Sequence, residues 1–175
     1  MNRRRLDVEA WRDAMLAVAD RLDATIGGPS VSLDAPSNYR RTLYATISRH
    51  DLAWMLRLFD FPDPNITSGG RALTTVPLQQ LFVLNSEFMV TNAGAIATRL
   101  LSPSRPDRND GERIRQAYLL LYGRAATERE LSLGLAYLQS PEHAATGAPA
   151  PRDSLSHWQR YAQALLAANE FLFID

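Results

Sequence analysis

The sequence predicts an all-α fold, and three observations support this prediction. Apolar residues recur at spacings of three and four along most of the chain, which is the period of an amphipathic helix. Capping residues bound several of these segments, and clusters of proline, glycine and small polar residues separate them. The 175 residues, of which 46% are hydrophobic, suffice to bury one core. We therefore expect a single compact domain over residues 1–175, with about six helices, long loops and one short extended element.

The first expected helix covers residues 7–23. Its apolar stripe consists of Val8, Trp11, Met15, Val18 and Leu22. Gly27-Gly28-Pro29 ends this region and begins a loop. Residues 39–49 fit strand alternation as well as a helical turn, so we predict a short extended or irregular element there.

Helical spacing returns over residues 51–60. Residues 61–71 contain two prolines, two glycines and polar turn formers, which predicts a loop. Thr74 or Thr75 is expected to cap a short buried helix that has Pro77 in its first turn. The expected packed face of this helix consists of Leu78, Leu81 and Phe82.

Ser86 is expected to begin a longer helix with Glu87 in its first turn. The apolar stripe of this helix is Met89, Ala93, Ile96 and Leu100. Residues 102–111 are rich in proline, aspartate and arginine, which predicts an exposed linker, and Gly123 marks the end of the next helix. The inward face of that next helix is Ile114, Tyr118 and Leu121.

Thr127-Glu128-Arg129-Glu130 fits a capping box, in which the threonine bonds forward and the glutamate bonds back. The helix that it begins is expected to bury Leu131, Leu135 and Leu138. Residues 140–151 form a second expected loop, and the last helix is expected over residues 154–171. Its inward residues are Leu155, Trp158, Ala162 and Leu165.

Composition excludes several kinds of chemistry. The chain has no cysteine, which excludes a thiol nucleophile and cysteine-ligated zinc, iron–sulfur or haem groups. Every basic residue is arginine, so no lysine can form a Schiff base or bind a nucleotide phosphate in a P-loop. The three histidines, His50, His143 and His157, lack metal-ligand spacing, which favours capping or solvent-facing roles. We expect no cofactor and no bound metal.

The charge distribution argues against nucleic-acid binding. The net charge is zero, and Arg3-Arg4-Arg5 and Arg40-Arg41 are too short to form a basic stripe. The apolar stretches fall short of a membrane span. No apolar segment follows the first arginines, so we expect no secretion signal within this chain.

Residues 60–71 form the strongest candidate site, because two carboxylates, an amide and a guanidinium fall in one loop between two helices. The candidate binding residues are Asp60, Asp63, Asn65, Arg71 and Asn85. A structural interpretation competes with this one. In that interpretation Asp63 and Asn65 cap turns, and Arg71 pairs with an acidic residue.

Several stretches match a known pattern in the same order along essentially the whole chain. They are Asn2-Arg3-Arg4-Arg5-Leu6-Asp7 with Trp11-Arg12-Asp13-Ala14-Met15-Leu16-Ala17-Val18, Tyr39-Arg40-Arg41-Thr42-Leu43-Tyr44, Leu58-Phe59-Asp60-Phe61-Pro62-Asp63, Arg71-Ala72-Leu73-Thr74-Thr75-Val76-Pro77-Leu78-Gln79-Gln80-Leu81, Leu84-Asn85 with Phe88, Tyr122-Gly123-Arg124-Ala125-Ala126-Thr127, and Asn169-Glu170-Phe171-Leu172. In these stretches the chain resembles a C-terminal domain of large planctomycete proteins, many of which carry an N-terminal c-type cytochrome module. That domain is known as domain of unknown function 1553.

The resemblance implies a context but no activity. It implies that the chain is the C-terminal part of a longer exported polypeptide, in the periplasm or at the cell surface. The chain departs from many relatives at Val76, where they have threonine, and from some at Gly70, where they have cysteine. The glycine leaves no thiol role for the loop.

Three functions follow as hypotheses. The leading one is a non-catalytic accessory or interaction domain that presents the loop to other domains of the full-length protein, or to a protein or glycan partner. The second is a glycan-directed hydrolase, which would need two close carboxylates such as Asp60, Asp63 or Glu87. The third is a calcium-stabilised binding module, although Ser68 and Thr74 stand where a calcium loop needs glycine and glutamate.

Overall fold

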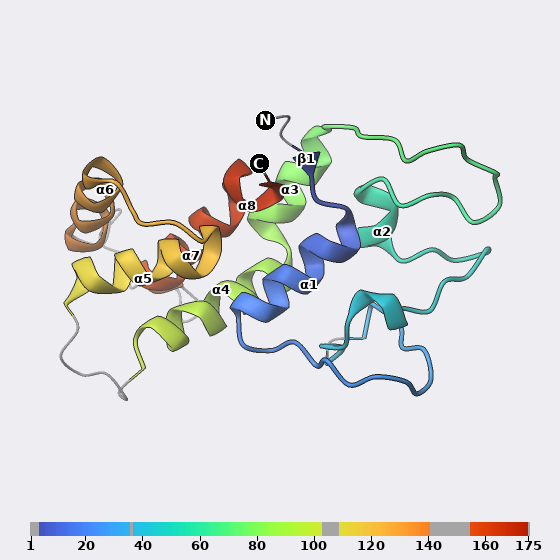
Figure 1. The fold of residues 1–175 in the computed structure, drawn as a ribbon, viewed down its shortest axis with the longest axis horizontal. Coiled ribbons are helices and arrows are strands. Elements are labelled where there is room, and N and C mark those ends of the chain that lie inside the picture. The colour runs from blue at the N-terminus through green and yellow to red at the C-terminus, as the bar shows by residue number, and fades with distance from the viewer. Residues whose placement is uncertain (1–3, 36, 103–108, 141–154, 175) are drawn as a thin grey trace, which may run out of the picture. The chain divides into compact units, whose positions relative to one another are not determined.

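The computed structural model describes residues 4–35, 37–102, 109–140 and 155–174, and it confirms the all-α prediction (Figure 1). The described residues form eight α-helices, one 3-10 helix and one antiparallel pair of two-residue strands. Their contacts divide the chain into two compact units. Unit 1 is Met1–Ser86 with Leu172–Asp175, and unit 2 is Glu87–Phe171. A single domain over residues 1–175 stays a prediction.

Unit 1 consists of short elements joined by long loops. They are β1 (Arg4–Arg5), α1 (Val8–Val18), the 3-10 helix η1 (Thr42–Tyr44), α2 (Trp54–Leu58), α3 (Pro77–Asn85) and β2 (Phe173–Ile174). Across the ladder Arg4 faces Ile174, and Arg5 faces Phe173. The pairing joins segments from opposite ends of the chain. Periodicity does not predict it, because each strand has only two residues.

Helix α1 carries the core of unit 1. It buries Val8, Trp11, Arg12, Met15 and Leu16, which confirms most of the predicted stripe. The helix ends at Val18, earlier than expected, because Asp20 adopts a left-handed φ of 58°. Helix α2 is likewise shorter than the predicted helix over residues 51–60, since Asp60 adopts a φ of 64°.

Arg12 is a buried cation that ties α1 to a distant segment. Its guanidinium donates to Asn38 O at 2.6 Å, to Arg40 O at 2.9 Å and to Thr42 Oγ1 at 3.1 Å. These bonds fix residues 39–49, which form a single 3-10 turn and isolated bridges rather than regular structure. The prediction of a short irregular element there is confirmed.

The start of α3 differs from the prediction. Pro77 begins the helix as expected, but Val76 occupies the N-cap and provides no side-chain cap. Thr74, one of the two expected caps, instead donates its hydroxyl to Asp60 Oδ1 at 2.6 Å. The Thr74 hydroxyl therefore forms a tertiary contact with Asp60 and does not provide the cap of α3 that the local sequence pattern predicts.

The packed face of α3 also differs from the prediction. Leu78 and Leu81, expected inside, are 54% and 53% exposed, and only Phe82 of the expected face is partly covered. The buried residues are Gln79 and Val83. Gln79 Nε2 donates to Leu58 O at 2.9 Å, so the amide satisfies a carbonyl at the end of α2.

Unit 2 is built from the remaining helices. They are α4 (Glu87–Leu100), α5 (Asp110–Tyr122), α6 (Glu128–Gln139), α7 (His157–Ala167) and α8 (Asn169–Leu172). Helix α4 packs chiefly on α7, and α5 packs on α6. The predicted stripe of α4 and the predicted inward face of α5 are buried, as expected. The predicted last helix is divided into α7 and α8, because Ala168 between them has extended backbone.

Local signals at the ends of these helices are confirmed. Thr127 and Glu130 form the predicted capping box at the start of α6. Gly123 ends α5 with a left-handed φ of 68°. Leu131 is buried as expected, and the other two expected leucines of α6 are only half-buried: Leu135 and Leu138.

Some predictions fall on residues that the structure does not describe. These are residues 103–108 of the expected linker, residues 141–151 of the second expected loop, and His143. Within the described ranges, none of the helices combines the length and the apolar content that crossing a membrane requires.

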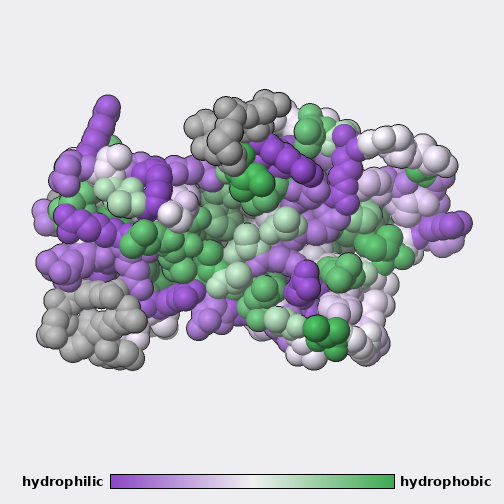
Figure 2. Space-filling view, in the orientation of Figure 1, coloured by the Kyte–Doolittle hydropathy of each residue, from purple (hydrophilic) through white to green (hydrophobic). Residues whose placement is uncertain are grey.

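Large apolar side chains lie exposed on unit 1, and Figure 2 shows apolar side chains at the molecular surface among polar ones. More than half of each of the following side chains is exposed: Leu43, Ile66, Leu73, Leu78, Leu81 and Leu84. Single exposed leucines are common on protein surfaces. A group of exposed apolar side chains within residues 66–84 is unusual, and such groups often mark interaction sites.

Candidate functional site

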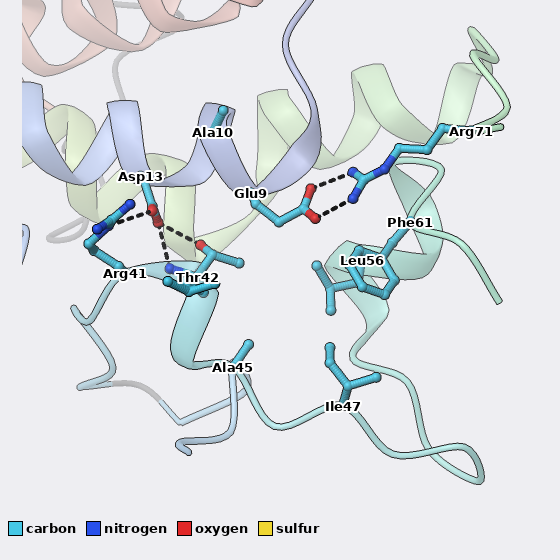
Figure 3. Close-up of a pocket in the computed structure, with 11 residues that line it drawn as sticks. Glu9, Ala10, Asp13, Arg41, Thr42, Ala45, Ile47, Leu56, Phe61 and Arg71 are labelled. Atoms are coloured by element: carbon cyan, nitrogen blue, oxygen red, sulfur yellow. Dashed lines mark hydrogen bonds and ion pairs between the residues drawn. The ribbon is translucent and has the colours of Figure 1, made fainter. Parts of the chain in front are cut away.

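A groove of about 470 Å³ lies within unit 1 (Figure 3). Helix α1, the segment around η1, α2 and the two ends of the loop over residues 61–71 line it. The lining residues are Glu9, Ala10, Asp13, Arg41, Thr42, Leu43, Ala45, Ile47, Leu56, Phe61 and Arg71. The volume falls within the range of ligand sites, and apolar side chains flanked by a few charged groups are typical of them.

An ion pair between Arg71 and Glu9 lies at one end of the groove. Arg71 donates from Nη1 and Nη2 to the two carboxylate oxygens of Glu9, each at 2.7 Å, and its Nη1 lies 3.8 Å from Asp7 Oδ1. The guanidinium also lies over the Phe61 ring, 5.4 Å from its centroid. Each terminal nitrogen of Arg71 therefore already has a carboxylate partner.

The pKa values reflect this pairing. Burial raises the pKa of Glu9, but hydrogen bonds from Arg71 and from the Glu9 backbone, with the charge of Arg71, bring it below its ordinary value. The hydrogen bond to Glu9 raises the pKa of Arg71. Both side chains therefore stay charged near neutral pH.

A carboxylate bonded to η1 occupies the other end. Asp13 Oδ1 accepts hydrogen bonds from Thr42 N at 2.7 Å and from Thr42 Oγ1 at 2.6 Å. Arg12 Nη1 lies 3.8 Å from Asp13 Oδ1, and Arg41 Nε lies 3.9 Å from Asp13 Oδ2. Glu9 and Asp13 are one helical turn apart on α1, so the two ends of the groove share one face of this helix.

Among the predicted site residues, Asp60 closes the loop. Its Oδ2 accepts from Thr74 N at 2.9 Å, and its Oδ1 accepts from Thr74 Oγ1 at 2.6 Å. Arg5 Nη1 lies 3.4 Å from Asp60 Oδ2 and donates to Thr74 O at 2.5 Å. The side chains of Arg5 and Asp60 are 8% and 14% exposed, so this cluster is a structural clamp at the base of the loop.

Asp63 and Asn65 fix the shape of the loop. Asp63 Oδ1 accepts from Asn65 N at 2.8 Å and from Asn65 Nδ2 at 3.1 Å. Asn65 Nδ2 also donates to Arg49 O at 2.8 Å, which ties the loop to the segment before α2. These contacts are the turn-capping roles of the structural interpretation.

Only Arg71 of the five candidate residues lines the groove. Asn85 lies at the end of α3, where its Nδ2 donates to Leu81 O at 3.0 Å. The sequence reasoning missed Glu9, Asp13 and Arg41 as groove residues. The spacing of Glu9 and Asp13 beside an apolar stripe was a visible signal, but nothing local indicated that η1 would face them.

The acidic residues named for the hydrolase alternative do not lie together as free carboxylates. A carboxylate hydrolase needs two free carboxyls in a cleft, whereas Asp60 and Asp63 are bonded to Thr74 and Asn65. Glu87 is exposed at the first position of α4. Within the residues that the structure describes, no three acidic or histidine side chains cluster closely enough to hold a metal ion.

A family model matches residues 1–138, which include the whole groove. The chain belongs to the PSD1 family. Its description is a protein of unknown function (DUF1553), so PSD1 membership supplies no activity and no site residues. Neither a curated protein nor a solved structure matches this PSD1 chain.

Proposed function

We propose that this PSD1 chain is a non-catalytic accessory domain that binds another domain of a longer, extracytoplasmic polypeptide. The surface that it presents is the loop over residues 60–71 together with residues 72–84, which continue into α3. The missing thiol and lysine nucleophiles and the bonded carboxylates of the loop support a binding role rather than a chemical one.

One observation carries the proposal: this surface is anchored at several points yet projects apolar side chains. Asp60 and Asn65 fix it at two points, and Arg71 fixes its end to Glu9 on α1. In contrast, Ile66 is 66% exposed and Leu73 is 69% exposed. A preorganised loop loses little conformational entropy on binding, so its apolar side chains can contribute most of their burial to affinity.

The charge pattern after the loop supports the same surface. Residues 72–86 contain no charged side chain, although 22% of the whole chain is charged. Three leucines within this stretch are more than half exposed: Leu78, Leu81 and Leu84. Depletion of charge around exposed apolar side chains is typical of the centre of a protein–protein interface.

The extracytoplasmic location rests on the resemblance to exported planctomycete proteins. It predicts that antibodies to the chain detect it in the periplasmic or surface fraction of cells of its source. Detection only with cytoplasmic proteins would contradict this part of the proposal.

Calorimetric titration of the chain with the remainder of its own full-length polypeptide tests the function. We expect specific binding, and the variants Ile66→Ser and Leu73→Ser should each weaken it about tenfold, the scale of one buried aliphatic side chain. Leu133→Ser is the matched control, because Leu133 is 61% exposed on α6 and lies outside the proposed surface.

Three results would contradict the proposal. They are absence of binding to any other part of the polypeptide, equal affinity of the loop variants and the parent, and turnover of a glycan by the isolated chain. The melting temperature of each variant should match that of the parent, since the changed side chains are exposed. We also expect no change of melting temperature with calcium or with a chelator.

A further inference from the structure

We propose that the groove beside this loop binds an extended peptide segment of the partner, with a carboxylate next to an apolar side chain. The inference rests on the proposed function, because it names the chemistry that the partner would present. Three features of the groove support it: the cation at one end, the different charge balance of the two ends, and the apolar lining between them.

Arg41 is the cation of the groove with the most unused bonding capacity. Its side chain is 49% exposed, and its closest acidic atom is Asp13 Oδ2, which lies 3.9 Å from Nε and beyond hydrogen-bond distance. Within the described chain its guanidinium has no hydrogen-bond acceptor. A carboxylate from a ligand can therefore accept two parallel bonds from this guanidinium.

The charges at the two ends set the direction of the ligand. At the η1 end, Arg12 and Arg41 face the single carboxylate of Asp13, a balance of two positive charges against one negative. At the loop end the balance is reversed, because Arg71 faces the carboxylates of Asp7 and Glu9. An anionic group of the ligand therefore belongs at Arg41 and not at Arg71, whose terminal nitrogens both bind Glu9.

The lining between the ends is apolar. Leu56 is fully buried and Phe61 is half-buried beside it, while the small side chain of Ala45 leaves room between the two ends. An aliphatic side chain placed there would lose contact with water on several sides. Burial of one such side chain would therefore add to the affinity of a peptide whose carboxylate binds Arg41.

A peptide segment fits the surroundings better than a free small molecule. Leu43 is 72% exposed and Ile47 is 43% exposed, so the apolar surface continues outward from the groove lining. On the other side, Phe61 and Arg71 belong to the loop that the proposed function places at the partner interface. A segment of a protein partner would cover both margins at once, and a small amphiphile would leave them exposed.

Two capped five-residue peptides test the inference by NMR titration of the whole chain. Both have glycine at each end and leucine at the second and fourth positions, with glutamate or glutamine between them. We expect the glutamate peptide to shift the amide signals of Ala10, Thr42 and Ala45, and to bind about tenfold more tightly than the glutamine peptide. Higher salt should narrow this difference.

Variants of Arg41 give a readout that a purely structural role would not change. Arg41→Gln should remove the preference for glutamate, and Arg41→Glu should create a preference for the same peptide with lysine at the centre. Ala45→Leu should block both peptides by filling the lining. Arg57→Gln is the matched control, because Arg57 is exposed on α2 and lies outside the groove.

Several outcomes would overturn the inference. Equal binding of the glutamate and glutamine peptides would remove the role of Arg41, and octanoate binding as tightly as the peptide would favour a small amphiphile. If the partner polypeptide binds, and Ile66→Ser weakens this binding while Arg41→Gln and Ala45→Leu do not, the groove inference fails and the proposed function stands. If the partner does not bind at all, the proposed function itself fails.

Discussion

At the scale of single residues, polar side chains of this chain hold distant segments together. Asp60 is the clearest case in unit 1, because its two oxygens join the start of the loop to Thr74 at its end. Its left-handed φ of 64° suits aspartate and is unfavourable for most other side chains. Asp60 therefore has a structural role in the loop, and its predicted role in binding stays a prediction.

Replacing Asp60 should therefore loosen the loop. Asp60→Ala removes both hydrogen bonds with Thr74 and places a Cβ without a polar group in a left-handed position, so we expect a loss of about 2–3 kcal/mol in unfolding free energy. Asp60→Asn tolerates that backbone and keeps one acceptor, so its loss should be about 1 kcal/mol. Urea unfolding measures both. Equal effects of the two variants would contradict this account of the clamp.

Arg124 has the corresponding role in unit 2. It donates from Nη1 and Nη2 to Glu130 at 2.9 and 2.7 Å, and from Nε and Nη2 to Glu170 at 2.5 and 2.7 Å. The network joins the end of α5 to the start of α6 and to α8. It gives a structural role to Arg124, which lies within the residues that the family model matches.

The pKa of Glu130 makes this network sensitive to acid. Hydrogen bonds from Arg124, and then from Thr127, outweigh burial and lower the pKa of Glu130 from 4.5 to about 2. Because the pKa is lower in the folded state, the stabilisation is complete above about pH 4.5 and is lost as the pH falls toward 2.

Glu130→Gln tests this linkage. Glutamine keeps the capping box but removes the charge, so we expect a loss of about 1 kcal/mol at pH 7, since the pair is partly exposed. Between pH 4.5 and 2 the variant should lose less stability than the parent. Melting temperatures across this range measure the effect, and parallel pH profiles for variant and parent would refute it.

At the scale of elements, one glycine sets how closely α6 approaches its neighbours. A Cβ at Gly134 would lie 2.7 Å from Tyr161 Oη on α7 and 2.9 Å from Ile114 Cδ1 on α5. Both distances are shorter than real Cβ contacts, so the Tyr161 and Ile114 side chains would have to shift within a closely packed interior to admit a larger residue.

Gly134→Ala should therefore destabilise unit 2. Alanine favours the helix by about 1 kcal/mol, but the overpacking costs about 1–3 kcal/mol, so we expect a net loss of stability. Gly69→Ala is the control, because a Cβ at Gly69 would meet no atom within 4 Å. Thermal unfolding measures both variants. A stabilised Gly134→Ala would show that helix propensity outweighs packing there.

Helix α3 shows where local patterns mislead. Its leucines predict an inward apolar face, yet the helix turns Gln79 inward and leaves Leu78 and Leu81 exposed. The amide of Gln79 binds the Leu58 carbonyl, which periodicity cannot anticipate because the two lie 21 residues apart. Because the leucines of α3 face outward, they form the uncharged apolar surface on which the proposed function depends.

At the scale of the whole molecule, the chain returns to unit 1 after completing unit 2. The last described residues pair as β2 with β1, and Leu6 N donates to Leu172 O at 2.8 Å. Unit 1 therefore contains residues from both ends of the sequence. Its β1–β2 ladder forms only when segments about 170 residues apart meet.

Deleting residues 172–175 tests this dependence. The deletion removes the β1–β2 ladder and the bond from Leu6, so we expect a loss of about 2–3 kcal/mol, at about 1 kcal/mol for each backbone hydrogen bond. Ile174→Ser is the control, because it keeps the backbone pairing and changes a side chain that is half exposed. Guanidinium unfolding measures both, and unchanged stability of the truncated chain would show that the ladder contributes nothing.

The sequence by itself determined α4, α5 and α6 of unit 2, because their signals are local. The stripe of α4, the capping box at Thr127 and the glycine that ends α5 each depend on residues within a few turns of one another. It also determined the loop over residues 61–71 through its proline and glycine content. Only the tertiary structure decided the groove, since Glu9 and Arg71 meet across 62 residues of sequence. Local periodicity cannot predict a contact over that separation, because the contact depends on how α1, η1 and α2 pack together.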